Sequence, residues 1–71
     1  GHGQSIQKLT GREIEVLQLL ARGFTNKEIS EKLFLSVKTI EAHRSKIYQK
    51  LNIKTRAELV DYAIRHKLME L

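Results

Sequence analysis

The sequence predicts an all-α fold, a four-helix bundle that contains a helix-turn-helix unit. Its 71 residues make one small domain, include no proline and show no alternation of apolar and polar residues that would indicate a strand. Three times a threonine stands three residues before a glutamate, a capping box in which each side chain accepts a hydrogen bond from the other residue's amide. These boxes are Thr10 with Glu13, Thr25 with Glu28, and Thr55 with Glu58.

The first two helices follow each other closely in the sequence. We expect the first helix to begin after Thr10 and to end at Gly23, because glycine readily adopts the left-handed conformation that terminates many helices. The second helix begins at Thr25 and ends near Leu33. Asn26 is an alternative cap for this helix, since asparagine is also favoured at the capping position.

The third helix is separated from the second by only three residues, 34–36. Such a short turn makes two helices meet at a steep angle, as in a helix-turn-helix unit, although the glycine that is common in this turn is missing here. Ser36 is the predicted cap of the third helix, which covers about residues 37–51. The fourth helix is predicted to run from Thr55 to about Lys67.

The composition excludes several classes of protein and of site. With no cysteine, the chain has no disulfide, no thiolate zinc site and no thiol nucleophile. Its apolar runs are far shorter than the roughly 20 residues that span a bilayer. We find no glycine-rich phosphate loop, metal-ligand cluster or nucleophile paired with a base, so we predict neither an enzyme nor a bound metal or cofactor.

The ends of the chain also suggest an interpretation. Residues 1–6 are interpreted as a tag remnant and linker, which leaves residues 7–71 for the domain. No signal peptide is visible, so we expect a cytoplasmic protein.

The positive charge is confined to one stretch of the chain. The formal net charge is +5, and residues 38–56 contain six basic residues and a single acidic one, Glu41. This stretch therefore holds the whole net charge. A basic segment of this kind favours an anionic partner, and the alternatives are nucleic acid, an anionic membrane and an acidic protein.

The third helix has one apolar side and one side of small and polar residues. At about 100° per residue, Ile40, Ile47 and Leu51 fall in a narrow arc, which predicts the buried side. Small side chains on the opposite side let a helix approach base edges in the major groove, while flanking cations reach the phosphates. That opposite side consists of Lys38, Ala42, Ser45 and Gln49, with Glu41 at its border.

Six fragments of the chain keep the order and spacing of a known family. They are Leu9–Leu17, Gly23, Asn26–Ile29, Leu35–His43, Lys50–Leu51 and Arg56–Val60. Together they resemble the LuxR-type helix-turn-helix domain of the NarL/FixJ class. The resemblance implies a bacterial transcription regulator that binds double-stranded DNA with its third helix in the major groove. It further implies the C-terminal effector domain of a two-component response regulator, with an N-terminal receiver domain outside this chain; a stand-alone regulator is the alternative.

The resemblance also implies that Lys38, Glu41, Ala42 and Ser45 contact bases. Many family members have a basic residue or an amide at one or more of these positions, so acidic Glu41, apolar Ala42 and short Ser45 depart from the pattern. In one interpretation Glu41 accepts a hydrogen bond from a cytosine amino group and Ala42 packs on a thymine methyl group. In the other, Glu41 pairs with Lys38 or Ser45 and contacts no base.

Phosphate contacts are expected at the start of the second helix and on the flanks of the third. Free amides and the helix dipole attract anions at a helix start, and long cationic side chains reach the DNA backbone from the flanks. The predicted residues are Thr25, Asn26, Lys27, Thr39, Arg44, Lys46 and Lys50.

The fourth helix has two apolar stripes, one of which closes the core. From the resemblance we expect a homodimer on two-fold related half-sites, with Leu59, Tyr62 and Ala63 at the interface. The other stripe is formed by Ala57, Val60, Ile64 and Leu68, and which stripe faces a second copy stays open. A basic helical module that binds an acidic protein is the alternative function. An RNA-binding domain is disfavoured, because no aromatic platform for stacking bases is apparent.

Overall fold

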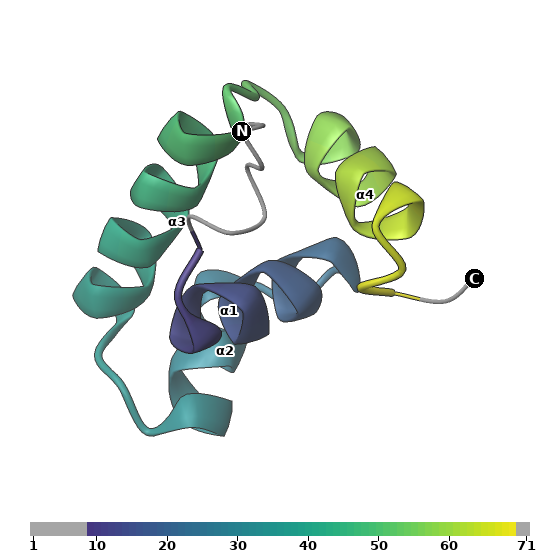
Figure 1. Cartoon of the computed structure of the whole chain (residues 1–71). Helices are drawn as coiled ribbons and strands as arrows, with labels where there is room; N and C mark the ends of the chain where they lie inside the picture. The colour runs from purple at the N-terminus through teal and green to yellow at the C-terminus, as the bar shows by residue number, and fades with distance from the viewer. Residues whose placement is uncertain (1–8, 70–71) are drawn as a thin grey trace.

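The computed structural model describes residues 9–69 and confirms the predicted all-α fold of four helices (Figure 1). The interpretation of residues 1–6 as a tag remnant and linker lies outside the described residues. Within residues 9–69, no helix has the length and apolar character needed to cross a membrane. The helices are α1 (Gly11–Ala21), α2 (Asn26–Leu33), α3 (Val37–Leu51) and α4 (Arg56–Arg65).

Each helix begins at the side chain that the sequence predicts as its cap. In all three threonine–glutamate boxes the hydroxyl accepts a hydrogen bond from the glutamate amide, and the carboxylate accepts one from the threonine amide. Thr25 is the cap of α2, so Asn26 is the first residue of that helix. Ser36 caps α3 by accepting a hydrogen bond from the Thr39 amide at 3.0 Å. Local sequence therefore determines where all four helices start.

All four helices end in the same way. A residue just beyond each helix, the first after α2 and α3 and the second after α1 and α4, adopts the left-handed conformation. The next amide donates a hydrogen bond to the carbonyl five residues earlier, as in a Schellman motif. In α4 this turn ends the helix at Arg65, two residues before the predicted end near Lys67. The four left-handed residues are Gly23, Phe34, Asn52 and Lys67.

The hydrophobic core is built around α1, which contacts each of the other three helices. Val16, Leu17 and Leu20 of α1 have no exposed surface. Burying an aliphatic side chain of this size stabilises the fold by roughly 1.5–3 kcal/mol. The fully buried partners from the other helices are Ile29, Ile40, Ile47, Leu59 and Ala63.

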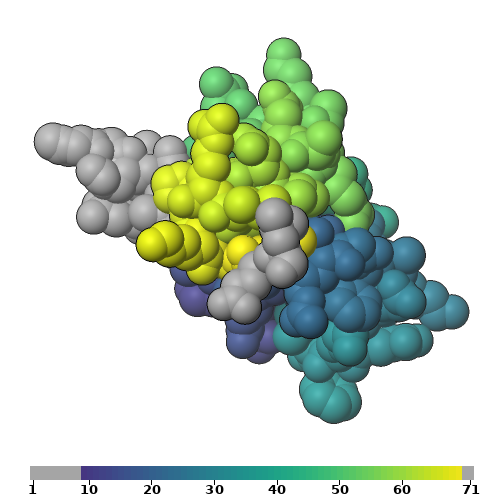
Figure 2. Space-filling view, turned by 90° about the vertical axis from the view of Figure 1, so that its right-hand side faces the viewer, coloured from purple at the N-terminus to yellow at the C-terminus, as the bar shows by residue number. Residues whose placement is uncertain are grey.

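Long-range hydrogen bonds connect α4 to α1. The Arg56 guanidinium at the start of α4 donates to the carbonyl oxygens of Leu20 at 2.8 Å and Phe24 at 3.3 Å. Beyond the end of α4, Gln18 Nε2 donates to the carbonyl oxygen of Leu68 at 3.0 Å. In Figure 2, the α4 region in green to yellow accordingly lies beside the end of α1 in blue.

The positions of Leu59 and Ala63 correct one prediction. The sequence placed both at a dimer interface, but neither has any exposed surface, because both belong to the hydrophobic core. Tyr62 is half-buried, and its ring lies 4.1 Å from that of His66. The second stripe of α4 is more accessible, since it includes the exposed Ala57 and the half-buried Ile64.

Candidate nucleic-acid interface

The residues predicted to contact bases share one exposed side of α3. The opposite side of the helix packs on α1 and α2, where Ile40 and Ile47 are completely buried. This packing leaves the small side chains free of contacts that would prevent another molecule from approaching the backbone. We refer to the four exposed residues as the outer face of α3: Lys38, Glu41, Ala42 and Ser45.

Glu41 is accessible on this outer face. Among the described residues, no ion pair joins its carboxylate to Lys38, and no side-chain hydrogen bond joins it to Ser45. The structure therefore does not contain the pairing of Glu41 with Lys38 or Ser45, and the carboxylate is exposed.

The residues predicted to contact phosphate have different surroundings. Lys46 is exposed on one flank of α3, and the half-buried Thr39 beside it places its hydroxyl 2.8 Å from Ser36 Oγ. At the start of α2, the Thr25 hydroxyl serves the cap, while Lys27 is exposed. Asn26 Oδ1 is buried without a hydrogen-bond partner.

Lys50 has a role that the sequence did not predict. Its ammonium lies 2.8 Å from Glu13 Oε1, so it connects the last turn of α3 with the first turn of α1. The Lys50 side chain is 30% exposed and that of Glu13 only 4%. This partly buried ion pair gives Lys50 an internal partner, where the sequence predicts a phosphate contact. No sequence signal reveals it, because the two residues lie 37 positions apart.

The surroundings of Glu13 favour its charged form. Burial raises the pKa of this carboxyl, but hydrogen bonds from Lys50 and from the Thr10 amide lower it, as do the charges of Lys50 and His43. The pKa of Glu13 therefore lies below its usual value. The ion pair is stable at neutral pH, and the α1 cap and α3 share one carboxylate.

Arg44 lies on the other flank of α3 from Lys46. Its guanidinium carbon is 5.3 Å from the centre of the Tyr48 ring, within the range of a cation–π contact. Tyr48 is not among the residues predicted to contact DNA, although its spacing of four residues from Arg44 places both on one side of the helix.

The positive charge on the surface is less than the sequence suggests. Of the six basic residues between positions 38 and 56, Lys50 is paired with Glu13 and Arg56 donates to backbone carbonyls. The remaining cations lie on α3 and in the loop after it, and they are Lys38, Arg44, Lys46 and Lys54.

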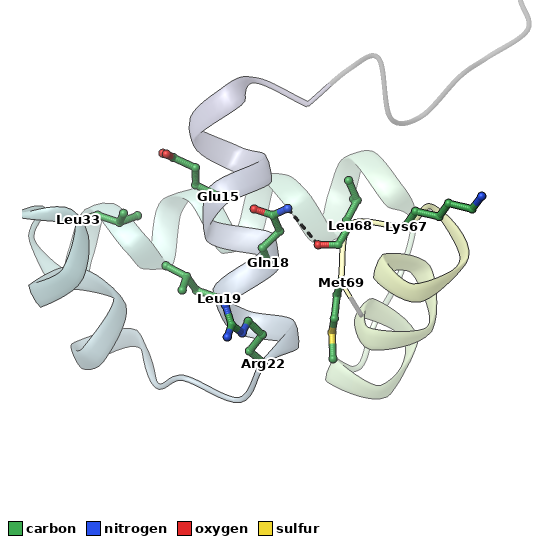
Figure 3. A pocket seen from close by; sticks show the side chains of 8 residues that line it. All are labelled: Glu15, Gln18, Leu19, Arg22, Leu33, Lys67, Leu68 and Met69. Atoms are coloured by element: carbon green, nitrogen blue, oxygen red, sulfur yellow. Dashed lines mark hydrogen bonds between the residues drawn. The ribbon is translucent and has the colours of Figure 1, made fainter. Parts of the chain in front are cut away.

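Two other features of the described residues lie apart from this interface. An open pocket of about 650 Å³ lies between α1, the end of α2 and residues 67–69 (Figure 3). It contains no residue of α3, and the Gln18–Leu68 hydrogen bond crosses part of it. Within residues 9–69, no group of three or more His, Cys, Asp or Glu side chains is placed to hold a metal ion.

Comparison with known proteins agrees with this geometry. A family model described as "Bacterial regulatory proteins, luxR family" matches residues 7–63. The chain is 58% identical over 62 residues to the oxygen regulatory protein NreC of Staphylococcus carnosus, and 56% identical to the proteins of that name from Staphylococcus epidermidis and Staphylococcus aureus. These matches cover 87% of this chain but only 28–29% of each relative. The chain thus spans less than a third of the length of these curated relatives.

Proposed function

Because the chain belongs to the luxR family of bacterial regulatory proteins, a DNA-binding and non-enzymatic family, we propose that it recognises specific double-stranded DNA by placing α3 in the major groove. The outer face of α3 is the observation that carries this proposal. Its centre is formed by Ala42 and Ser45, which are small and exposed, and Lys46 lies on its flank. This arrangement suits close approach to base edges with phosphate contacts beside them.

Each residue of the outer face has a proposed partner. Glu41 accepts a hydrogen bond from a cytosine amino group, and Ala42 packs on a thymine methyl group. Lys38 and Ser45 donate hydrogen bonds to base acceptors. These contacts supply sequence preference, because each base pair presents its own pattern of donors, acceptors and methyl groups in the major groove.

Phosphate contacts position the helix and supply affinity. We assign them to Lys46 and Thr39 beside the outer face, and to Lys27 with the amide of Asn26 at the start of α2, since the Thr25 amide already donates to Glu28. The helix dipole and the free amides favour an anion at that start. Such contacts are independent of sequence and weaken as the salt concentration rises.

At the level of the whole regulator, we propose a cytoplasmic protein that binds two half-sites as a homodimer. The proposed dimer surface is the exposed stripe of α4 with Ala57 and Ile64. The relatives are more than three times as long as the matched segment, which supports a longer regulator with a receiver domain and response-regulator control. A stand-alone regulator is the alternative.

Selection from a random duplex library tests this function. The chain is incubated with the library at about physiological salt, where non-specific binding is weak, and the bound duplexes are sequenced. We expect an enriched motif with two-fold symmetry. We expect Ser45→Arg to change the preferred bases, and Lys46→Ala to weaken binding to all duplexes alike, lowering the slope of log K against log salt by about 0.9.

Lys67→Asn is the matched control for charge. Lys67 is exposed beyond α4 and adopts the left-handed conformation, which asparagine tolerates. This variant removes one positive charge away from α3, so we expect an unchanged motif. Absence of any enriched sequence, or equal losses on selected and random duplexes for every outer-face variant, would contradict base recognition by α3.

A further inference from the structure

An open groove of about 760 Å³ runs along the C-terminal half of α3 and the loop that follows it. It includes Glu41 and Ser45, so it is continuous with the outer face. It lies on the side of α3 opposite Lys46 and Thr39. Its lining residues are Glu41, Arg44, Ser45, Tyr48, Gln49, Asn52, Ile53 and Lys54.

The groove lies on the flank of α3 opposite the flank that carries Thr39 and Lys46. At about 100° per residue, Thr39 and Tyr48 lie roughly 90° to either side of the centre of the outer face. A helix in the major groove has a DNA backbone on each side. Thr39 and Lys46 serve one side, whereas Arg44, Tyr48 and Lys54 face the other.

Two side chains in the groove, those of Arg44 and Tyr48, can bind an anion. Among the ion pairs of residues 9–69, none includes Arg44, whose guanidinium instead packs over the Tyr48 ring at 5.3 Å. This contact restricts an otherwise flexible side chain, which lowers the entropy lost when it binds. The Tyr48 hydroxyl is shielded from solvent and has no hydrogen-bond partner, so it retains an unused donor.

The charges place the anion at one end of the groove. Glu41 is the only acidic residue in the lining; at 1.5 Å per residue it lies about 10 Å along the helix from Tyr48 and about 4.5 Å from Arg44, so an anion is favoured toward Tyr48 and Lys54. Arg44 and Lys54 are the cations. The Lys54 backbone amide donates a hydrogen bond to the exposed Glu58, which lowers the pKa of that carboxyl, and the Lys54 charge contributes less.

We propose that this groove binds a backbone phosphate of the DNA strand on the second side of α3. Arg44 supplies the charge, the Tyr48 hydroxyl donates a hydrogen bond once its ring turns to bring the shielded hydroxyl into the groove, and Lys54 adds attraction from the loop. The proposal rests on the proposed function. It adds Tyr48 and Lys54 to the DNA-binding residues and makes α3 a helix held from both flanks.

The test compares two tyrosine-to-phenylalanine variants. Tyr48→Phe removes only the hydroxyl and keeps the ring under Arg44. Tyr62→Phe is the matched control, since the Tyr62 hydroxyl is also shielded and unpartnered but lies on α4, away from the stripe with Ala57 and Ile64 to which we assign the dimer surface in place of Tyr62. We expect Tyr48→Phe to weaken binding about three- to tenfold on selected and random duplexes alike, and Tyr62→Phe to bind like wild type.

Salt dependence and phosphate ethylation give independent readouts. We expect Arg44→Met to lower the salt slope by about 0.9. Ethylation of single phosphates in the selected duplex tests which phosphates the protein contacts. We expect it to weaken wild-type binding on both sides of the DNA major groove. We expect the Tyr48→Phe and Arg44→Met variants to be insensitive to ethylation on the side that faces Arg44 and Tyr48. Urea unfolding of each variant verifies that it is folded.

The outcomes separate this proposal from the proposed function. Suppose that the wild-type chain selects a DNA sequence. If Tyr48→Phe then binds DNA with unchanged affinity, or Arg44→Met shows an unchanged salt slope, the groove proposal is overturned while the proposed function stands. Interference confined to the side of Lys46 would also overturn the groove proposal. A wild-type chain that enriches no sequence would instead contradict base recognition by α3.

Discussion

The Glu13 carboxylate joins two parts of the molecule that lie far apart in the sequence. Its Oε1 atom accepts hydrogen bonds from the Thr10 amide, within the α1 cap, and from the Lys50 ammonium in the last turn of α3. Because Glu13 is only 3% exposed, its charge is shielded from water and depends on these donors. A single side chain thus stabilises a helix start and orients the helix that we propose enters DNA.

We expect Glu13→Gln to lower the free energy of unfolding at neutral pH by about 1–3 kcal/mol, because the negative charge that strengthens the hydrogen bond from Lys50 is lost. The substitution should also flatten the decline of stability in acid. Since the folded-state pKa of Glu13 is lowered, its stabilisation is present above the unfolded-state value near 4.5 and disappears as the pH falls through the lower folded value. Urea unfolding between neutral pH and about pH 3 measures both effects.

Glu15→Gln is the control for this experiment. Glu15 pairs with Arg12 at 3.3 Å on the exposed surface of α1, so removal of its charge should change stability by less than about 0.5 kcal/mol. If the free energy of unfolding of Glu13→Gln declines in acid as steeply as that of wild type, the Glu13 carboxylate does not contribute to stability through its charge.

At the scale of the helices, the end of α2 contains an unfavourable residue. Phe34 has φ 58° and ψ 43°, a left-handed conformation that costs a residue with a Cβ atom roughly 1–2 kcal/mol. Its side chain is 93% exposed, so packing offsets little of this cost. We expect Phe34→Asn to raise the free energy of unfolding by about 0.5–1 kcal/mol, as measured by urea unfolding, because asparagine tolerates this conformation.

Asn52 provides the reciprocal comparison. It has nearly the same backbone conformation at the end of α3, with φ 56° and ψ 46°. We expect Asn52→Ala to lower stability by about as much as Phe34→Asn raises it. Equal stability of Phe34→Asn and wild type would mean that the Phe34 backbone costs less than its conformation indicates.

The sequence predicts helix starts better than helix ends, and the reason is local chemistry. Thr10, Thr25 and Thr55 bond to residues three positions away, so the signal is contained in four residues. Helix ends depend on a left-handed residue, which sequence indicates clearly only for Gly23. Lys67 carries no such signal, so the end of α4 was predicted two residues too late.

The same distinction applies to the candidate interface. The outer face of α3 was predictable because helical periodicity separates it from buried Ile40 and Ile47. The roles of Lys50 and Arg56 were not predictable, because their partners come from α1 and the loop after it. Charge counted along a sequence does not reveal which cations the fold uses internally.

At the scale of the whole molecule, the two stripes of α4 should respond differently to substitution. Leu59→Ala removes a fully buried side chain and should lower the free energy of unfolding by about 2–5 kcal/mol. Ile64→Glu changes the half-buried side of α4, so we expect it to leave the monomer folded and to weaken cooperative binding to a duplex with two half-sites. Gel shifts on one-site and two-site duplexes, with urea unfolding, separate the two effects.

Ala57→Glu repeats the test at a second position of the same stripe. Both substitutions should leave binding to a single half-site unchanged, because they lie away from α3. Undiminished cooperativity in both variants would place the contact between copies elsewhere.

The central position of α1 has a mechanical consequence. Since α3 packs on α1 and α2, and α4 packs mainly on α1, a displacement of α4 reaches α3 through α1 as well as through the loop of residues 52–55. The Arg56 hydrogen bonds and the Glu13–Lys50 ion pair hold α1 near its two ends. In a dimer joined through α4, the distance between the two copies of α3 would therefore be set by how firmly α3 and α4 are held on α1. A fixed separation of the two α3 helices would allow little variation in the number of base pairs between half-sites.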